Sequence, residues 1–226
     1  GLKLGNFGWA SNFSFYYAHH MSTIEGGMVS TNNDEIYQML RMFRGHGLVR
    51  EASSQKIRDR YQRDYPELNP EFIFGVAGYN VRNTELGAIL GRKQLNRLDE
   101  NNKIRQRTLT FFLDNLDRSK FRTDYEIDGS CNYALPLVLR DPDIGMRDRL
   151  ESYLVKEGIE FRRGNAGGGN QLRQPYLSRL CRDREWENYP ETEHIHFFGY
   201  YIGNYPSLTN DKIRKICKVL NSISYD

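Results

Sequence analysis

The sequence predicts an α/β protein that continues into a C-terminal α+β domain. Strand-like apolar runs alternate with amphipathic helical patterns along the chain. A helical pattern also runs from Thr84 to Leu116, which is longer than a usual globular helix, so we expect a break near Asp99 to Asn102. Placing the domain boundary at that break divides the chain into residues 1–100 and 101–226, and the second part has a normal size for a small domain.

Composition indicates a globular protein with a core. The 226 residues are 38% hydrophobic and 27% charged. No apolar run approaches the roughly 20 residues of a membrane span, and no signal-peptide pattern opens the chain. A net charge of +3 argues against non-specific nucleic-acid binding. The three cysteines are far apart and odd in number, so they predict neither a disulfide framework nor a zinc site. Reduced thiols in a cytoplasm are the simplest account.

Residues 12–29 are the most informative stretch. Phe13, Phe15 and Tyr17 would lie on one face and Ser14 and Tyr16 on the other, which predicts a half-buried strand. The sequence then becomes polar, turns at 25–27, and begins a second apolar run at 28–29 that predicts a second strand. Two strands that meet at a polar turn can position reactive side chains.

This stretch resembles the cofactor-lysine region of the sugar aminotransferase (DegT/DnrJ/EryC1/StrS) family. The family pattern is Ser-Phe-x-x-x-Lys followed by an acidic-Gly-Gly turn, and Ser14, Phe15 and Glu25-Gly26-Gly27 match it. The resemblance implies the fold of type I pyridoxal-phosphate enzymes. Residues 1–100 would then be part of the cofactor-binding large domain, and residues 101–226 the small C-terminal domain. Ser14 would contact the cofactor.

His19 stands where the family has its lysine. An imidazole has no primary amine, so it cannot form the covalent link that lysine makes with the cofactor, but it can move protons near neutral pH. In this family a histidine here marks the 3-dehydratases, which make 3-deoxy sugars. The resemblance implies that pyridoxamine phosphate is held non-covalently, that His19 removes a proton and assists loss of the sugar hydroxyl, and that glutamate restores the amine. His20 is expected to be structural.

The resemblance also bears on the nucleotide. A related branch that acts on CDP-sugars carries an iron–sulfur cluster on four cysteines. Three cysteines cannot supply it, so a GDP-sugar is favoured.

A helix is predicted from Asn33-Asp34 to Gly45, followed by a turn that contains His46 and Arg50. These two residues either complement the negative end of the helix dipole or bind a ligand. In the resembling dehydratases the matching positions face the nucleotide sugar. Residues 51–70 are predicted to be an exposed loop with a possible short helix.

Gly78-Tyr79-Asn80-Val81-Arg82 matches a Gly-Tyr-Asn-x-Arg signature of the family. The resemblance implies that Asn80 reaches the cofactor phosphate of a neighbouring subunit, which implies a homodimer, and that Arg82 lies near the substrate. On residue chemistry alone Asn80 is equally a turn residue or a helix cap.

In the C-terminal part we expect a strand at 133–139, a helix at 146–157 and a short strand at 159–162. The glycine-rich run 163–171 is either a flexible connector or a loop whose backbone approaches a ligand, and it is no nucleotide fingerprint. By resemblance, Glu160 would face the sugar.

Residues 186–193 are predicted to be a loop, and His194–Gly203 an aromatic strand with His194 and His196 on one face. Without a third ligand this pair is weak evidence for a metal, so packing or ligand-lining roles are favoured and no metal site is predicted. Thr209 is expected to cap a final amphipathic helix.

Residues 1–8 match a segment that follows the family's cofactor-binding first half, so the chain is expected to be the C-terminal ~60% of such an enzyme. Two alternatives to a dehydratase therefore stay open. One is a sugar aminotransferase of the same fold, and the other is an inactive fragment.

Overall fold

The computed structural model describes residues 1–164 and 168–224, and the chain forms two compact units, Gly1–Leu98 and Asp99–Asp226. In the described part of the chain no helix is long and apolar enough to cross a membrane. The same residues contain no group of three or more His, Cys, Asp or Glu side chains that could hold a metal ion.

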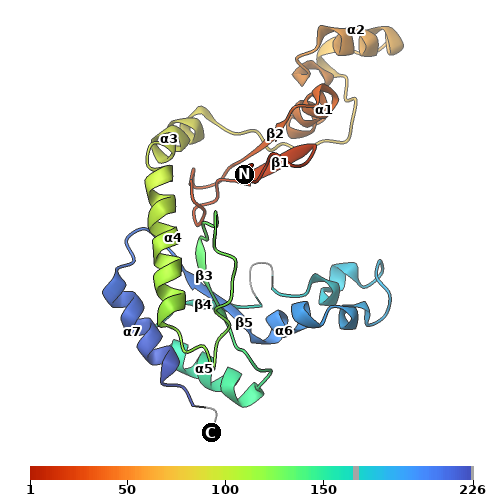
Figure 1. Ribbon diagram of the computed structural model, residues 1–226. Coiled ribbons are helices and arrows are strands. Elements are labelled where there is room, and N and C mark those ends of the chain that lie inside the picture. Colours follow the sequence, from red (N-terminus) through yellow and green to blue (C-terminus); the bar gives the residue numbers. More distant parts are fainter. Residues whose placement is uncertain (165–167, 225–226) are drawn as a thin grey trace. The chain divides into compact units, whose positions relative to one another are not determined.

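The first unit begins with a hairpin of β1 (Ala10–Ser14) and β2 (Gly27–Thr31), which pair antiparallel from Ala10 opposite Thr31 to Ser14 opposite Gly27 (Figure 1). The second predicted strand is confirmed. The prediction of a strand over residues 13–17 is wrong, because β1 ends at Ser14. A long turn follows β1 and begins at Phe15.

Helices make up the rest of the first unit. They are α1 (Asp34–Arg44), η1 (Val49–Glu51), α2 (Gln55–Asp64), η2 (Pro70–Phe72) and α3 (Glu85–Leu95). Asn33 caps α1 by accepting a hydrogen bond from the Ile36 amide at 3.0 Å, as its position before an apolar stripe predicts. The main apolar cluster of this unit is small: Met42, Val49, Ala52 and Ile73.

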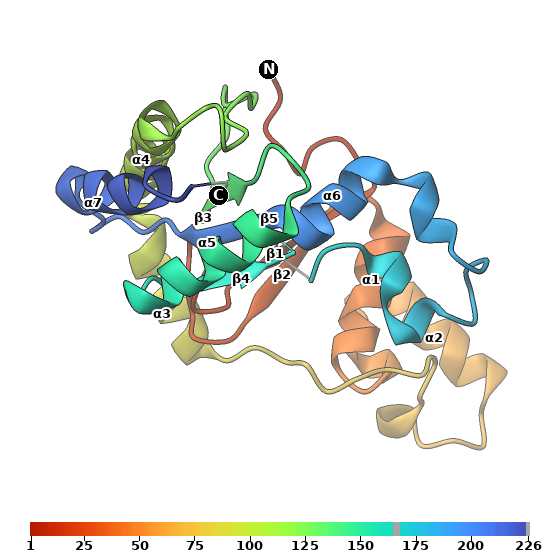
Figure 2. The same cartoon turned by 90° about the horizontal axis from the view of Figure 1, so that it is seen from below.

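The second unit is built on α4 (Leu98–Asn115), β3 (Ala134–Val138), α5 (Ile144–Lys156), β4 (Phe161–Arg163), β5 (Gly199–Gly203) and α7 (Asn210–Asn221). Its strands form an antiparallel sheet in the order β3-β5-β4. Figure 2 shows α5 lying across this sheet. The break between α3 and α4 falls at residues 96–97, slightly before the predicted position.

The core of the second unit lies between this sheet and α4, α5 and α7. Leu150 and Leu154 of α5 and Ile213 and Leu220 of α7 are completely buried. Helices α4 and α7 also contact each other through Asn221, whose side chain donates to the carbonyl of Asn115 at 2.9 Å. Thr209 caps α7 as predicted, accepting from the Lys212 amide at 3.4 Å.

The segment before β5 differs from its prediction. Residues 171–188 contain the short helices η3 (Gln171–Arg173), η4 (Pro175–Leu177) and η5 (Glu185–Asn188), and α6 (Pro190–Phe198) follows. The predicted loop over 186–193 and the strand from His194 are therefore wrong. His194 and His196 lie on a helix, and only the last part of the predicted strand, from Gly199, is extended. Pro in the first helical turn and early acidic residues favour this helix.

Candidate active site

The loop that carries His19 joins β1 to β2 and is closed at its base by backbone hydrogen bonds. The Phe15 amide donates to the Gly26 carbonyl at 2.8 Å, and the Thr23 amide donates to the Phe15 carbonyl at 2.9 Å. Within the loop the His19 amide donates to the Tyr16 carbonyl at 3.0 Å, and the His19 ring lies 6.2 Å from the Tyr16 ring, edge to face. The imidazole is therefore half-buried on a short, ordered turn.

Ser14 is the last residue of β1 and is exposed. Its Oγ accepts a hydrogen bond from the Tyr16 amide at 3.3 Å. A hydroxyl that accepts one hydrogen bond keeps its own hydrogen for donation to another group. Ser14 can therefore donate to an anionic ligand from the base of the loop that carries His19.

The His19 loop also meets the beginning of α3. A Cβ placed on Gly26 would lie 2.5 Å from Oγ1 of Thr23 and 3.4 Å from Nδ2 of Asn83. A Cβ on Gly91 would lie 3.4 Å from Cγ2 of Thr23. The turn is therefore packed against the segment that directly follows Asn80 and Arg82.

Two glycines make a close backbone crossing at the end of α1. A Cβ on Gly47 would lie 1.8 Å from the carbonyl oxygen of Val76, and one on Gly78 would lie 2.3 Å from the Gly47 nitrogen. The crossing is fixed by the His46 amide, which donates to the Tyr79 carbonyl at 2.7 Å. His46 itself has a φ of +64°, which is uncommon for a residue with a side chain.

The crossing places two of the predicted substrate and cofactor residues, His46 and Asn80, on adjoining backbone. Gly45 pairs with Asn80 in an isolated β-bridge, so His46 and Asn80 lie on neighbouring segments. Both side chains are exposed. Thr84, not Asn80, caps α3, accepting from the Gly87 amide at 3.4 Å. The alternative of Asn80 as the helix cap is therefore wrong.

Both predicted arginines of this unit are oriented by acidic residues. Nη2 of Arg82 lies 3.4 Å from Oε1 of Glu51. Nη1 of Arg50 donates to the Glu71 carbonyl at 3.0 Å and lies 3.7 Å from its carboxylate, while the guanidinium sits 5.1 Å from the Phe72 ring centre. Neither Glu51 nor Glu71 is predicted from the sequence as a partner of these arginines, because Glu51 falls in the predicted exposed loop over residues 51–70 and Glu71 lies just beyond it.

Glu160 belongs to the second unit. Its contact with the sugar, which the resemblance implies, stays a prediction. It is exposed and forms an ion pair with Arg162 at 2.8 Å. Of the glycine-rich run, residues 165–167 lie outside the described part of the chain. Gly164 and Gly168–Gln171 are described, and Gly164, Gly168 and Gly169 have positive φ.

The fold is that of type I pyridoxal-phosphate enzymes that modify sugars, as solved structures with 25% identity or more indicate. The model of the DegT/DnrJ/EryC1/StrS aminotransferase family matches residues 1–221, and the chain belongs to this family.

Two relatives from Escherichia coli are named for different reactions. GDP-4-keto-6-deoxy-D-mannose 3-dehydratase is 28% identical over 217 residues, which are 96% of this chain and 55% of the relative. GDP-perosamine synthase is 25% identical over 226 residues, which are 100% of this chain and 55% of that relative. A solved structure of the Escherichia coli dehydratase with bound hydrated PLP matches with a TM-score of 0.77 and 27% identity, over 96% of this chain and 55% of that one. The chain thus spans about half the length of these relatives.

Proposed function

We propose that this chain carries the proton-transferring histidine and substrate-binding side chains of a pyridoxamine-phosphate-dependent nucleotide-sugar 3-dehydratase, an enzyme that removes the hydroxyl on carbon 3 of a GDP-4-keto-6-deoxymannose. The observation that carries the proposal is His19, an imidazole in the β1–β2 loop at the position where the family pattern has lysine. The relatives named as 3-dehydratases, at 26% and 28% identity, support the same reaction.

The chemistry of the side chains fits the cofactor and the substrate. A serine hydroxyl and an asparagine amide, from Ser14 and Asn80, are neutral donors suited to a phosphate. Arg82, held beside Glu51, and Arg50, held beside Glu71, present guanidinium groups that can bind the diphosphate or hydroxyls of a nucleotide sugar. His46 completes this side of the proposed site.

When bound, the cofactor supplies an electron sink for carbon–hydrogen cleavage beside its amine. His19 would accept the proton on an imidazole nitrogen and then deliver a proton to the departing hydroxyl, serving as base and acid in turn. A histidine suits both steps because its ordinary pKa lies near neutral pH. Glu160 is a further candidate to contact the sugar.

The wider proposal includes a homodimer, because Asn80 is assigned to the cofactor phosphate of a neighbouring subunit. Glutamate would serve as the amine donor. The product would be a 3-deoxy-4-keto sugar on the route to colitose, a component of lipopolysaccharide O-antigens.

A sugar aminotransferase is the second candidate, and the match to GDP-perosamine synthase along the whole chain favours it. His19 opposes it, because amine transfer in this family uses the lysine. Product analysis separates the two: the dehydratase yields a deoxy keto sugar, and the aminotransferase yields an amino sugar.

Calorimetric titration of pyridoxamine phosphate into the 226-residue chain tests whether this half of the protein holds the cofactor. We expect saturable binding that Ser14→Ala and Asn80→Ala each weaken by about tenfold, as the loss of one hydrogen bond to an anion predicts. Heat that never saturates would contradict a working site in this chain and favour an inactive fragment.

A further inference from the structure

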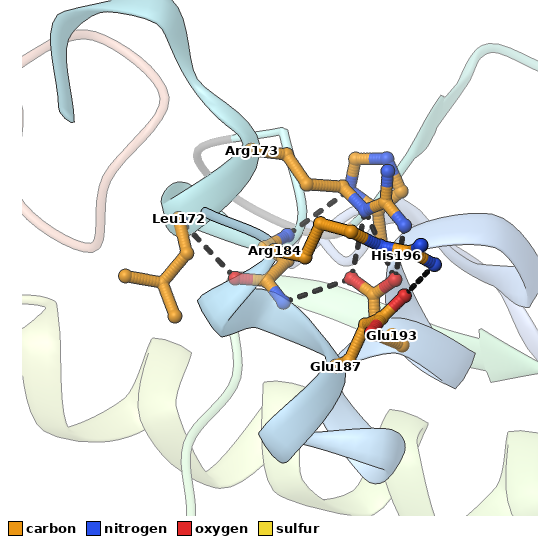
Figure 3. Close-up of polar contacts among 7 residues, drawn as sticks. Leu172, Arg173, Arg184, Glu187, Glu193 and His196 are labelled. Carbon is orange, nitrogen blue, oxygen red and sulfur yellow. Dashed lines mark hydrogen bonds and ion pairs between the residues drawn. The ribbon is translucent and has the colours of Figure 1, made fainter. Parts of the chain in front are cut away.

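Asn170 lies near the end of the glycine-rich run and joins that part of the chain to α6. It is only 2% exposed. Its backbone amide donates to Nδ1 of His196 at 3.0 Å, and its side-chain amide donates to Oε1 of Glu193 at 2.8 Å. Figure 3 labels the two partner side chains, Glu193 and His196. Its Oδ1 accepts from the Leu172 amide at 3.1 Å. One buried residue therefore fastens its own segment to two side chains of the helix.

Arg173 strengthens this attachment. Its Nε lies 2.9 and 3.0 Å from the two carboxylate oxygens of Glu193. Its guanidinium also lies 4.9 Å from the ring centre of Trp186 and 5.1 Å from that of Phe197. Hydrogen bonds from Arg173 hold the pKa of Glu193 below its ordinary value, with a smaller contribution from Asn170. Glu193 therefore remains an anion in this cluster.

Gly169 allows the segment to come close to the imidazole. Its φ is +84°, and a Cβ at this position would lie 2.4 Å from Nδ1 of His196. No residue with a side chain fits there without moving the ring or the backbone. The close contact between this segment and His196 therefore depends on glycine at position 169.

The hydrogen bond to Asn170 requires one protonation state of His196. A backbone amide can only donate, so Nδ1 must carry a lone pair and the ring must be neutral. Burial lowers the pKa of His196, and the positive charges of Arg173 on η3 and Arg163 on β4 lower it further. The carboxylate of Glu193 and a hydrogen bond with the backbone of Gly168 act in the opposite direction.

We propose that Asn170, Glu193 and His196 form a pH-sensitive latch, in which neutral His196 holds the backbone at Gly169–Asn170 against α6 and protonation of His196 breaks this attachment, while the ion pair of Arg173 with Glu193 persists. A base whose pKa is lowered in the folded state stabilises that state fully above its unfolded pKa, which is about 6.5 for histidine. The contribution is lost as the pH falls from that value toward the lowered pKa. The hydrogen bond between Asn170 and His196 is therefore complete at neutral pH and is lost as the pH falls.

Amide hydrogen exchange of the 226-residue chain, followed residue by residue by NMR at pH 7.5 and pH 5, tests the latch after correction for intrinsic exchange. We expect the protection of the Asn170 amide to fall by about tenfold at the lower pH, since one hydrogen bond is lost. His196→Asn keeps an acceptor near the position of Nδ1 but cannot titrate, so its protection should be the same at both values. His196→Leu has no acceptor and should be poorly protected at both.

The amides of Leu150 and Leu154 in the core report whether each variant is folded. Equal protection of Asn170 at both pH values in the unaltered chain would overturn the latch, and so would an equal loss in His196→Asn. Should His196→Leu unfold, the comparison between the unaltered chain and His196→Asn still decides the question.

Discussion

The proposed reaction depends on one side chain, the imidazole of His19, which lies on the turn between β1 and β2. If this turn occupies the place of the family's lysine, restoring a primary amine there should allow a covalent bond to pyridoxal phosphate. We expect His19→Lys, incubated with pyridoxal phosphate and reduced with borohydride, to gain the mass of one reduced cofactor. The unaltered chain should gain none at this position, and peptide mass spectrometry would locate the adduct.

His20→Lys is the matched control, because it places the same amine one residue along the same turn. It should be labelled at no more than the level of surface lysines. Equal and specific labelling of both variants would show that the turn does not aim position 19 at the cofactor. An unlabelled His19→Lys would remove the basis of the dehydratase proposal.

Gly47 controls the position of His46 and Asn80 through the backbone crossing. In Gly47→Ala the new Cβ would meet the Val76 carbonyl, and the φ of +81° adds strain. We expect a loss of about 3 kcal/mol or more in the unfolding free energy of the first unit. Gly158→Ala shares a positive φ of +64° but has no described heavy atom within 4 Å, so it should cost the second unit only about 1 kcal/mol. Urea unfolding measures both, and equal costs would argue against the crossing.

The backbone crossing at Gly47 and Gly78 shows which features of the candidate site the sequence predicts and which it does not. The resemblance singles out His46 in one stretch and Asn80 and Arg82 together in another, and no periodicity relates the two stretches. The glycine crossing that brings their segments together depends on contacts between positions about 30 residues apart. Glu51 and Glu71 were missed for the same reason, since an acidic residue in a charged loop gives no sign of which arginine it will meet.

At the scale of elements, the sequence best predicts the helices that carry local signals. α1, α5 and α7 each have an apolar stripe and a capping residue, which are local signals. The aromatic run near residue 197 was assigned to a strand because aromatics favour strands. It is in fact divided at Gly199 between the end of α6 and the start of β5. Likewise β1 ends before its aromatic alternation does, because pairing with β2 fixes its length.

The cap of α5 offers a prediction about a single element. Oδ1 of Asp143 accepts from the Met146 amide at 2.7 Å, and α5 contributes several fully buried side chains to the core. We expect Asp143→Ala to lower the unfolding free energy of the second unit by about 1 kcal/mol. Asp143→Asn retains the acceptor and should stay within a few tenths of a kcal/mol of the unaltered chain. Thermal or urea unfolding followed by circular dichroism checks this, and a cost as large for Asn as for Ala would assign the effect to charge instead.

At the scale of the whole chain, the two units differ in how much core they contain. The main apolar cluster of the first unit has four buried members, whereas that of the second unit draws on α4, α5, α7 and all three strands. The first unit also leaves large apolar side chains exposed, among them Leu86 at 74% and Ile89 at 59%. Stability grows with buried apolar area, so the first unit should open at lower denaturant concentration than the second.

Hydrogen exchange at increasing urea, read by peptide mass spectrometry, measures the two openings separately. Peptides from α1 should lose protection first, and peptides from α5 last. Val49→Ala should lower only the first transition, because Val49 belongs to the small cluster. Leu154→Ala should lower only the second, by about 3 kcal/mol, as truncation of a fully buried leucine predicts. A single shared midpoint that both substitutions shift equally would mean that the units unfold as one body, and the difference in core size would then have no thermodynamic consequence.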